Sequence, residues 1–289
     1  MSTLSVTIDD RLRLVTAVLA ASNWPSEEQR QLTHAVHPHA KQVRQLVQSF
    51  SSHPAVNGTN EALLNGVDLA DLFSAALRCT WPDFIPQEAL PHLLKIKDWV
   101  GSLADFAAKT AVATEFWPQH TAVWQEAQSA LEEIFAKGDL LAALGQLGDV
   151  VDTAVSLMPN LIFPMLSPVV ATREGALTLL LPPPKAVGES PPWPFDEDPG
   201  WVVATVVEQL VPYLLPGVLV PADPDQQFMA KQLAAAHCLA TLLDDFEAQA
   251  YLLRAKKEYD LPQLPILFAQ LQAEVYGGNG RSLTTVLQN

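Results

Sequence analysis

The sequence predicts an α+β protein in which helices predominate. Apolar residues recur at helical spacing through most of the first half, short β-branched or aromatic runs follow, and helical spacing resumes at Trp201. We divide the chain into residues 1–157, a helical part that begins with a short strand, and residues 158–289. The second part contains a small sheet, a proline-rich loop and C-terminal helices.

The first part begins with residues 4–9, which alternate apolar and polar side chains as an edge strand would. Asp9 or Asp10 then caps a helix that ends near residues 22–25. Further helical segments follow, and proline or glycine separates them. They begin at Ser26 and continue as residues 40–50, 67–79, 90–110, 115–135 and 139–156.

The second part begins with three short runs that are typical of strands at hairpin spacing, residues 159–166, 168–172 and 176–181. Pro182–Pro199 is rich in proline, which neither a central strand nor a helix tolerates, so we expect a long surface loop there. The sequence then predicts helices over residues 201–215, 225–259 and 264–276, the first of them with Pro212 inside it.

Composition limits the class of protein. The chain has 289 residues, of which 49% are hydrophobic and 17% charged, so it can bury a sizeable core. Its net charge of −15 disfavours nucleic acid and anionic membranes as partners. We find no signal peptide and no apolar stretch long enough to span a bilayer, and we therefore expect a soluble, cytoplasmic protein.

Two features of the sequence are interpreted as structural. Cys79 and Cys238 cannot form a disulfide framework, so we expect two buried thiols. The glycine-rich stretch 277–281 follows the last expected helix, and we interpret it as a helix end and turn rather than an anion site.

Three clusters of potential metal ligands occur. They are His34, His37 and His39; Asp244, Asp245 and Glu247; and Asp196, Glu197 and Asp198. We interpret the histidines as a polar helix end without a ligand, because Pro38 interrupts the helix between them. Carboxylates on so acidic a chain are more often solvated than bound to a cation, and we interpret both acidic clusters in that way.

The segment Trp201–Tyr213 has the register of a zincin active-site helix. In an H-E-x-x-H helix, two histidines four residues apart hold zinc and the glutamate between them polarises a water molecule. Here Glu208 stands at the glutamate position, while Val207 and Val211 stand where the histidines would be. Valine has no lone pair to donate, so this face cannot bind zinc.

The order of several segments resembles a bacterial family of unknown function, the DUF4932 type, which has a gluzincin-like zinc metallopeptidase core. The segments that carry the resemblance are residues 4–21, 52–56, 103–107, 116–120, 159–161, 176–181 and 259–262, together with the helix around Glu208. The resemblance implies a zincin-like core in residues 158–289. It also implies a third zinc ligand, a glutamate, whose position here falls at Lys231 or Gln232.

The resemblance therefore implies a non-catalytic relative of a zinc metallopeptidase that has lost its metal ligands and needs no cofactor. Glu208 would be a vestige of the general base. A residual cleft over Val207 and Val211, beside the strand 176–181, would bind a peptide or protein partner. Two alternatives stay open: an active hydrolase that uses other residues, such as Asp244, Asp245 and Glu247 with a histidine, or a purely structural protein.

Overall fold

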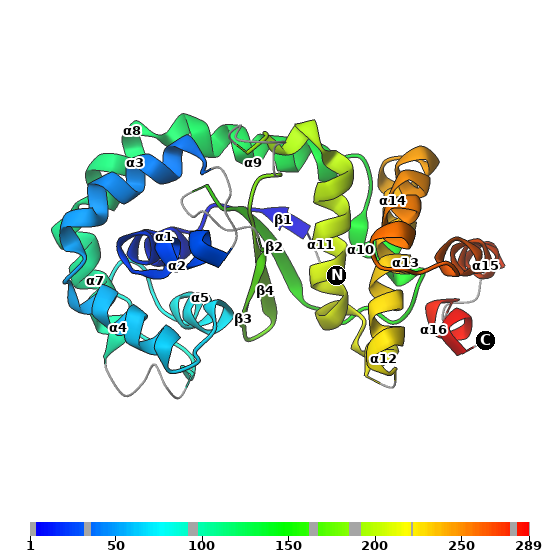
Figure 1. Cartoon of the computed structure of the whole chain (residues 1–289). Coiled ribbons are helices and arrows are strands. Elements are labelled where there is room, and N and C mark those ends of the chain that lie inside the picture. The colour runs from blue at the N-terminus through cyan, green and yellow to red at the C-terminus, as the bar shows by residue number, and fades with distance from the viewer. Residues whose placement is uncertain are drawn as a thin grey trace. The chain divides into compact units, whose positions relative to one another are not determined.

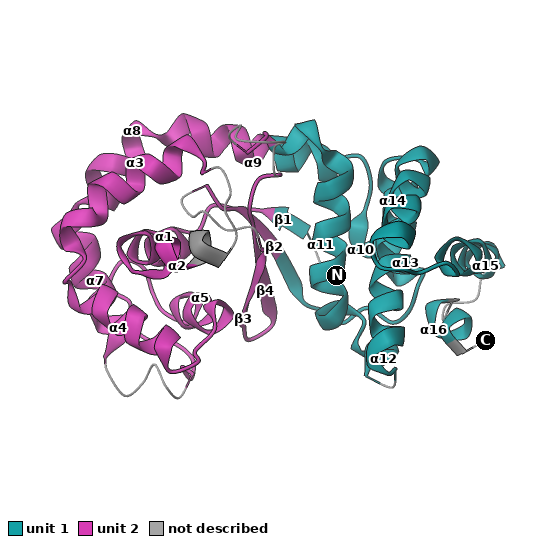
Figure 2. Ribbon diagram, viewed as in Figure 1, with its two compact units in different colours: residues 1–5, 130–155, 195–289 teal, residues 6–129, 156–194 magenta. Residues whose placement is uncertain are grey.

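The computed structural model confirms an α+β fold in which helices predominate and which contains a four-stranded sheet among the described residues (Figure 1). The structure describes residues 4–31, 36–91, 98–161, 167–184, 192–220, 222–277 and 282–288. It groups the chain into two compact units, coloured in Figure 2. Unit 1 comprises residues 1–5, 130–155 and 195–289, and unit 2 comprises residues 6–129 and 156–194. Neither unit is continuous along the chain, so this grouping differs from the expected division after residue 157.

Unit 2 contains most of the N-terminal helices and the β-hairpin. Its helices are α1 (Asp10–Ala21), α2 (Trp24–Gln31), α3 (Pro38–Val47), α4 (Pro54–Leu64), α5 (Leu69–Leu77), α7 (Trp99–Thr110), α8 (Trp117–Gln119) and the first part of α9 (Thr121–Phe135). A 3-10 turn, η1 (Gln48–Phe50), follows α3, and a π-helical turn, η2 (Val112–Phe116), precedes α8. Residues 92–97, in the expected helix 90–110, lie outside the described residues.

The sheet has the strand order β1-β2-β4-β3, in which β1 (Leu4–Val6) is an edge strand as expected. β3 (Val169–Arg173) and β4 (Ala176–Leu181) form an antiparallel hairpin. Its turn contains Gly175 with a φ of +66°, a conformation that glycine adopts without strain. Five of the six residues of β4 are buried, which explains why this strand is apolar apart from Thr178.

The fourth strand, β2 (Ala154–Pro159), was not expected at that position. The sequence predicted a helix over residues 139–156, but α10 (Leu140–Gly145) ends before Gly148 and the strand begins at Ala154. The prediction was wrong because residues 154–157 alternate between more exposed and buried side chains, as in a strand. Val155 and Leu157 are buried while Ser156 between them is partly exposed. Of the expected strand 159–166, residues 162–166 lie outside the described residues.

Unit 1 contains the C-terminal helices. They are α10, α11 (Pro199–Leu214), α12 (Pro216–Leu219), α13 (Pro224–Leu242), α14 (Asp245–Glu258), α15 (Leu264–Tyr276) and α16 (Ser282–Gln288), with a 3-10 turn, η3 (Phe195–Glu197), before α11. α13 packs against α10, α11, α14, α15 and α16, so it forms the centre of this unit. Its small residues Ala234, Ala235 and Ala236 are completely buried, which lets the neighbouring helices approach closely.

The expected long helix over residues 225–259 is two helices. α13 ends at Leu242, and Asp244 begins α14 by accepting a hydrogen bond from the backbone N–H of Glu247 at 2.9 Å. Sequence reasoning missed this break because no proline or glycine marks it, only an aspartate at a capping position. The end of α15 at Tyr276 agrees with the prediction, and Gly277 is its C-cap.

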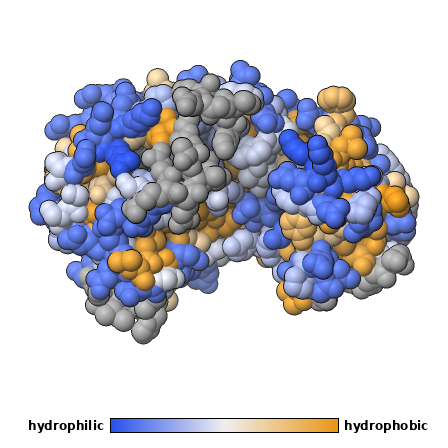
Figure 3. Space-filling model, viewed as in Figure 1, coloured by the Kyte–Doolittle hydropathy of each residue, from blue (hydrophilic) through white to orange (hydrophobic). Residues whose placement is uncertain are grey.

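Two further expectations concern the surface and the thiols. Both cysteines are buried and free, as expected. Within the described residues, no helix is both long and apolar enough to cross a bilayer. Hydrophilic residues cover most of the face in Figure 3, and hydrophobic patches interrupt them over α13–α16.

Candidate functional site

The helix that carries Glu208 forms as the sequence predicted. Asp198 caps α11 by accepting a hydrogen bond from the Trp201 N–H at 2.9 Å, and Pro199 occupies its first turn, where no N–H is needed. Val207 and Val211 therefore lie one turn apart on one helix. Both side chains are completely buried, with an exposed fraction of 0%. Their burial makes them core residues, and no binding surface is formed by these two side chains.

Glu208 belongs to a polar cluster that joins three helices of unit 1. The Tyr251 hydroxyl of α14 lies 2.6 Å from Oε1 of Glu208 on α11. The same hydroxyl lies 2.6 Å from Oε1 of Gln232 on α13. Tyr251 and Gln232 are buried, with exposed fractions of 6% and 2%, while Glu208 is half-buried. We call these three residues the tyrosine junction.

A phenol has one proton, so the Tyr251 hydroxyl cannot donate to both oxygens at once. When Glu208 is ionised, Tyr251 donates to its carboxylate, and the Gln232 amide donates through its NH₂ group after a flip of the amide. When Glu208 is protonated, it donates to the Tyr251 oxygen, and Tyr251 donates to Gln232. The tyrosine junction therefore satisfies its hydrogen bonds in either protonation state of Glu208.

The electrostatic surroundings of the tyrosine junction favour the protonated form of Tyr251. Burial raises the pKa of Glu208 above its usual value, although the hydrogen bond from Tyr251 and the charges of Arg254 and Lys231 oppose the shift. Burial also raises the pKa of Tyr251, and the neighbouring Glu208 adds to that shift. A tyrosine that holds its proton so firmly is neither a nucleophile nor a general base near neutral pH.

The residues at the expected zinc positions do not fit a zinc ion. Val207 and Val211 have no donor atoms, and Lys231 would repel a cation. Gln232 is the alternative third position. It is linked to Glu208 through the Tyr251 hydroxyl, which lies within hydrogen-bond distance of both side chains. Among the described residues, no three histidine, cysteine, aspartate or glutamate side chains are grouped so that they could hold a metal ion.

The histidine cluster separates into different roles. His34 lies outside the described residues. His37 caps α3, since its Nδ1 accepts a hydrogen bond from the His39 N–H at 3.2 Å. His39 is buried, and its Nε2 accepts a hydrogen bond from Nε1 of Trp124 at 3.0 Å. Pro38 begins α3 instead of breaking a helix, because its ring suits the first helical position.

Neither acidic cluster forms a group of ligands. Asp244 is the N-cap of α14, while Asp245 and Glu247 lie in its first turn. Asp244 and Asp245 are exposed, in agreement with the interpretation of this cluster as solvated. Asp198 is likewise the cap of α11, and Asp196 and Glu197 belong to η3. Negative side chains at helix N-termini stabilise the helix through its dipole, which explains why these acids gather there.

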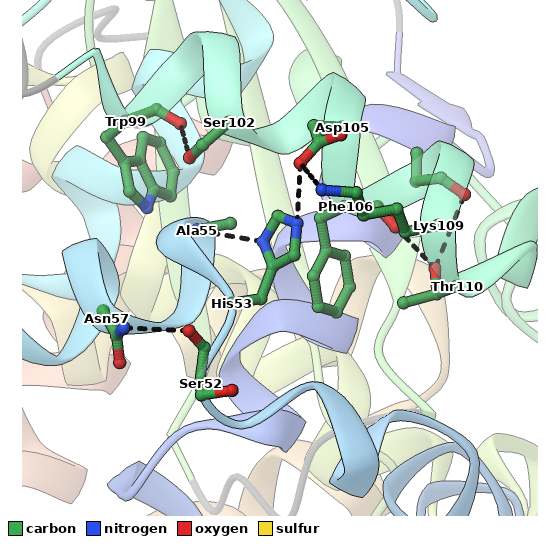
Figure 4. A network of polar contacts seen from close by, with 11 residues as sticks. Ser52, His53, Ala55, Asn57, Trp99, Ser102, Asp105, Phe106, Lys109 and Thr110 are labelled. Atoms are coloured by element: carbon green, nitrogen blue, oxygen red, sulfur yellow. Dashed lines mark hydrogen bonds and ion pairs between the residues drawn. The ribbon is translucent and has the colours of Figure 1, made fainter.

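Unit 2 contains a histidine–aspartate pair that sequence reasoning did not connect. Nε2 of His53 lies 2.9 Å from Oδ2 of Asp105, and Nζ of Lys109 lies 2.8 Å from the same oxygen (Figure 4). Nδ1 of His53 accepts a hydrogen bond from the Ala55 N–H, so Nε2 carries the proton that Asp105 accepts. Both ring nitrogens are thus occupied. The pair positions α4 on α7 and leaves no free nitrogen to act as a base.

Among the described residues, unit 1 contains a pocket of about 550 Å³. We call it the apolar pocket. Its lining residues are Phe228, Met229, Leu261, Leu267, Val286 and Leu287, with Asp225, Gln226, Tyr259 and Gln263. These residues come from α13, α15, α16 and the segment before α15, so the sequence gives no local signal for the pocket. A second, smaller pocket of about 270 Å³ lies beside His237 and Gln146.

The apolar pocket adjoins the tyrosine junction through α13. Phe228 lies one helical turn before Gln232, and its ring packs edge-on against Tyr259 with a centroid distance of 5.1 Å. Burial raises the pKa of Tyr259, and the negative charges of Glu258 and Glu208 add to that shift. Phe228 and Tyr259 are 37% and 44% exposed, so two aromatic rings are available at the pocket. Such rings are typical of binding sites, where they supply contact area at low entropic cost.

The chain was compared with family models, with curated proteins and with solved structures, and none of the three comparisons found a match. The resemblance to a gluzincin-like metallopeptidase family stays a prediction.

Proposed function

We propose that this protein is a non-catalytic binding protein whose apolar pocket holds an apolar side chain of a basic peptide or protein segment. The observation that carries the proposal is the pocket itself. Its volume of about 550 Å³ lies within the range of ligand sites, and its lining is mostly apolar with a few polar groups that would orient a ligand. The expected residual cleft over Val207 and Val211 is not part of this proposal, because those side chains are buried.

Charge favours a basic partner. Unit 1 contains 17 acidic and 6 basic residues, whereas unit 2 contains 15 acidic and 11 basic residues. Most of the excess negative charge therefore lies in the unit that contains the apolar pocket. Asp225 lines the pocket and would pair with a lysine or arginine beside the apolar anchor. Electrostatic attraction of this kind raises the association rate and selects against acidic partners.

The absence of catalysis is part of the same proposal. Val207 and Val211 cannot hold zinc, and the hydroxyl of Tyr251 occupies the space next to Glu208 where a polarised water would lie. A relationship to metallopeptidases would then be one of ancestry, with peptide binding retained and hydrolysis lost.

A peptide array tests the proposal. One set of peptides carries leucine or phenylalanine flanked by lysine and arginine, and a matched set replaces the basic residues by aspartate and glutamate. We expect the labelled protein to bind the basic set and Phe228→Ala to weaken that binding about tenfold, because one aromatic contact is lost. Phe246→Ala is the control, because Phe246 is 78% exposed on α14 and does not line the pocket.

Two results would contradict the proposal. Equal binding of the basic and acidic sets would exclude charge selection, and equal losses in the two phenylalanine variants would exclude the apolar pocket. Bound peptides are then incubated with the protein and added zinc, and their masses are measured. We expect intact peptides. Cleavage that disappears in Glu208→Gln would show instead that the protein is a hydrolase.

A further inference from the structure

An unusual arginine lies in unit 2, which does not contain the apolar pocket. The guanidinium of Arg13, on α1, is stacked between two indole rings, with its central carbon 4.1 Å from the Trp117 ring centroid and 4.4 Å from that of Trp124. Its side chain is only 9% exposed. Nη1 donates to Asp10 at 3.0 Å, and the Asp10 side chain, which is 41% exposed, is hydrogen-bonded to this one nitrogen of the guanidinium.

The opposite edge of the guanidinium has no partner in the part of the chain that the structure describes. Nε and Nη2 of Arg13 are buried and make no hydrogen bond to any described residue, and the same is true of the indole Nε1 of Trp117. Nε and Nη2 present two parallel N–H groups, which is the geometry that binds a carboxylate through both of its oxygens. Burying the N–H groups of a charged side chain without an acceptor costs free energy. We therefore expect an acceptor to bind at this edge of Arg13.

Arg11, two residues earlier on the same helix, shows what such an edge binds in this chain. Its Nε and Nη2 donate to the two carboxylate oxygens of Asp9, at 3.0 and 2.6 Å. Arg13 has the same edge without the carboxylate. The comparison is direct, because both side chains extend from α1 and both guanidinium groups are at least half-buried.

We propose that the free edge of Arg13, together with Nε1 of Trp117, is a binding site for the carboxylate group of a small molecule. A planar ion with one negative charge matches a planar guanidinium between two flat rings. Phosphate and sulfate are tetrahedral and carry up to two negative charges, so the neighbouring Asp10 carboxylate would repel them more strongly than it repels a monovalent carboxylate. Phosphate and sulfate are therefore the weaker candidates.

The neighbouring rings define the rest of the site. Trp124 donates its indole N–H to His39, while the indole N–H of Trp117 has no acceptor among the described residues. Trp81 stacks on Trp117 with a centroid distance of 6.0 Å and is partly exposed, so the aromatic cluster reaches the surface of unit 2 there. Burial lowers the pKa of Arg13 to about 10, which leaves the guanidinium charged at neutral pH.

Tryptophan fluorescence tests the site, because two indoles enclose the guanidinium. The full-length protein is titrated with sodium formate and sodium acetate at constant ionic strength, and the melting temperature is measured in parallel. We expect a saturable fluorescence change with a dissociation constant on the order of 1 mM, the range that so small a ligand can reach. The melting temperature should rise over the same concentration range.

The two tryptophans provide a matched pair of variants. Trp117→Phe removes the free N–H and keeps a ring over Arg13, so it should weaken formate binding about tenfold. Trp124→Phe removes an N–H that is already bonded to His39 and should change the affinity less than about threefold. Arg13→Gln should abolish the response to formate. If that variant does not fold, the difference in formate affinity between Trp117→Phe and Trp124→Phe still tests the proposal.

Three outcomes would overturn the proposal. In the first, folded wild-type protein shows no saturable response to formate or acetate, which would mean that the free donors of Arg13 bind water alone. In the second, both tryptophan variants lose the same affinity, which would exclude a role for the free indole N–H. In the third, sulfate or phosphate binds as tightly as formate, which would replace the carboxylate by a general oxyanion site.

Discussion

The hydroxyl of Tyr251 is hydrogen-bonded to Glu208, the residue that the sequence pattern places at a catalytic position. Glu208 has the register of a zincin general base, yet its carboxylate is hydrogen-bonded to Tyr251, which also contacts Gln232. The three side chains come from α11, α13 and α14, so the tyrosine junction ties together the centre of unit 1. A satisfied polar network of this kind favours one arrangement of the helices over others.

We expect Tyr251→Phe to destabilise the protein by about 1–3 kcal/mol, because it leaves the buried Gln232 amide and the Glu208 carboxyl without their shared partner. Urea unfolding measures the difference. Tyr213→Phe is the control, since Tyr213 is 41% exposed, and it should change stability by less than about 0.5 kcal/mol. A Tyr251 variant as stable as the control would show that the junction contributes no net stability.

The pKa of Glu208 leads to a prediction about pH. Burial raises this pKa in the folded protein, so the folded state keeps the proton to a higher pH than the unfolded chain does. The stability that this carboxyl contributes is therefore fully present below its ordinary pKa of 4.5 and is lost as the pH rises through the raised value. Glu208→Gln cannot ionise and should become more stable relative to wild type over that interval.

Urea unfolding at a series of pH values from about 4 to 8 measures this trend. Glu133→Gln, an exposed change on α9, controls for the loss of one negative charge. A constant difference between Glu208→Gln and wild type across the series would contradict a raised pKa.

At the level of secondary-structure elements, aspartate begins many of the helices. Its side chain accepts a hydrogen bond from a backbone N–H of the first turn and so satisfies one of the donors that every helix start leaves free. The aspartates that cap helices in this way are Asp9, Asp68, Asp139, Asp198, Asp223 and Asp244. Two clusters that resembled cation sites in the sequence thus contain capping residues.

Substitutions of Asp244 and Asp245 distinguish a helix-capping role of this acidic cluster from metal binding. We expect Asp244→Ala to cost about 1 kcal/mol of stability, because α14 loses its N-cap, and Asp245→Ala to cost less, because it loses only a favourable interaction with the helix dipole. Thermal unfolding with and without calcium, magnesium or zinc measures both effects. If a divalent ion stabilises wild type and neither variant, the acidic cluster is a metal site after all.

For the whole molecule, the dominant electrostatic feature is its net charge of −15, most of which lies in unit 1. Like charges repel within a compact structure and oppose folding, and salt screens that repulsion. We therefore expect the melting temperature to rise when sodium chloride is increased from about 20 mM to about 500 mM. A melting temperature independent of salt would show that the negative charges are too far apart to matter.

The sequence by itself determined the helical character, the edge strand at residues 4–6, the hairpin strands after residue 168 and the helix around Glu208. These features depend on local periodicity, capping residues and turn residues, which the chain carries in consecutive positions. It failed at β2 and at the break between α13 and α14. There the local pattern was compatible with a helix, and pairing with other strands or a capping aspartate decided otherwise.

The candidate sites were decided by tertiary structure alone. Glu208 could be placed on a helix from the sequence, but its partners Gln232 and Tyr251 come from two other helices. The apolar pocket and the free edge of Arg13 combine residues that are distant along the chain, and no local pattern brings them together. Sequence spacing specifies which residues share one face of one helix. Which faces meet, and which polar atoms find partners there, depends on the packing of the folded chain.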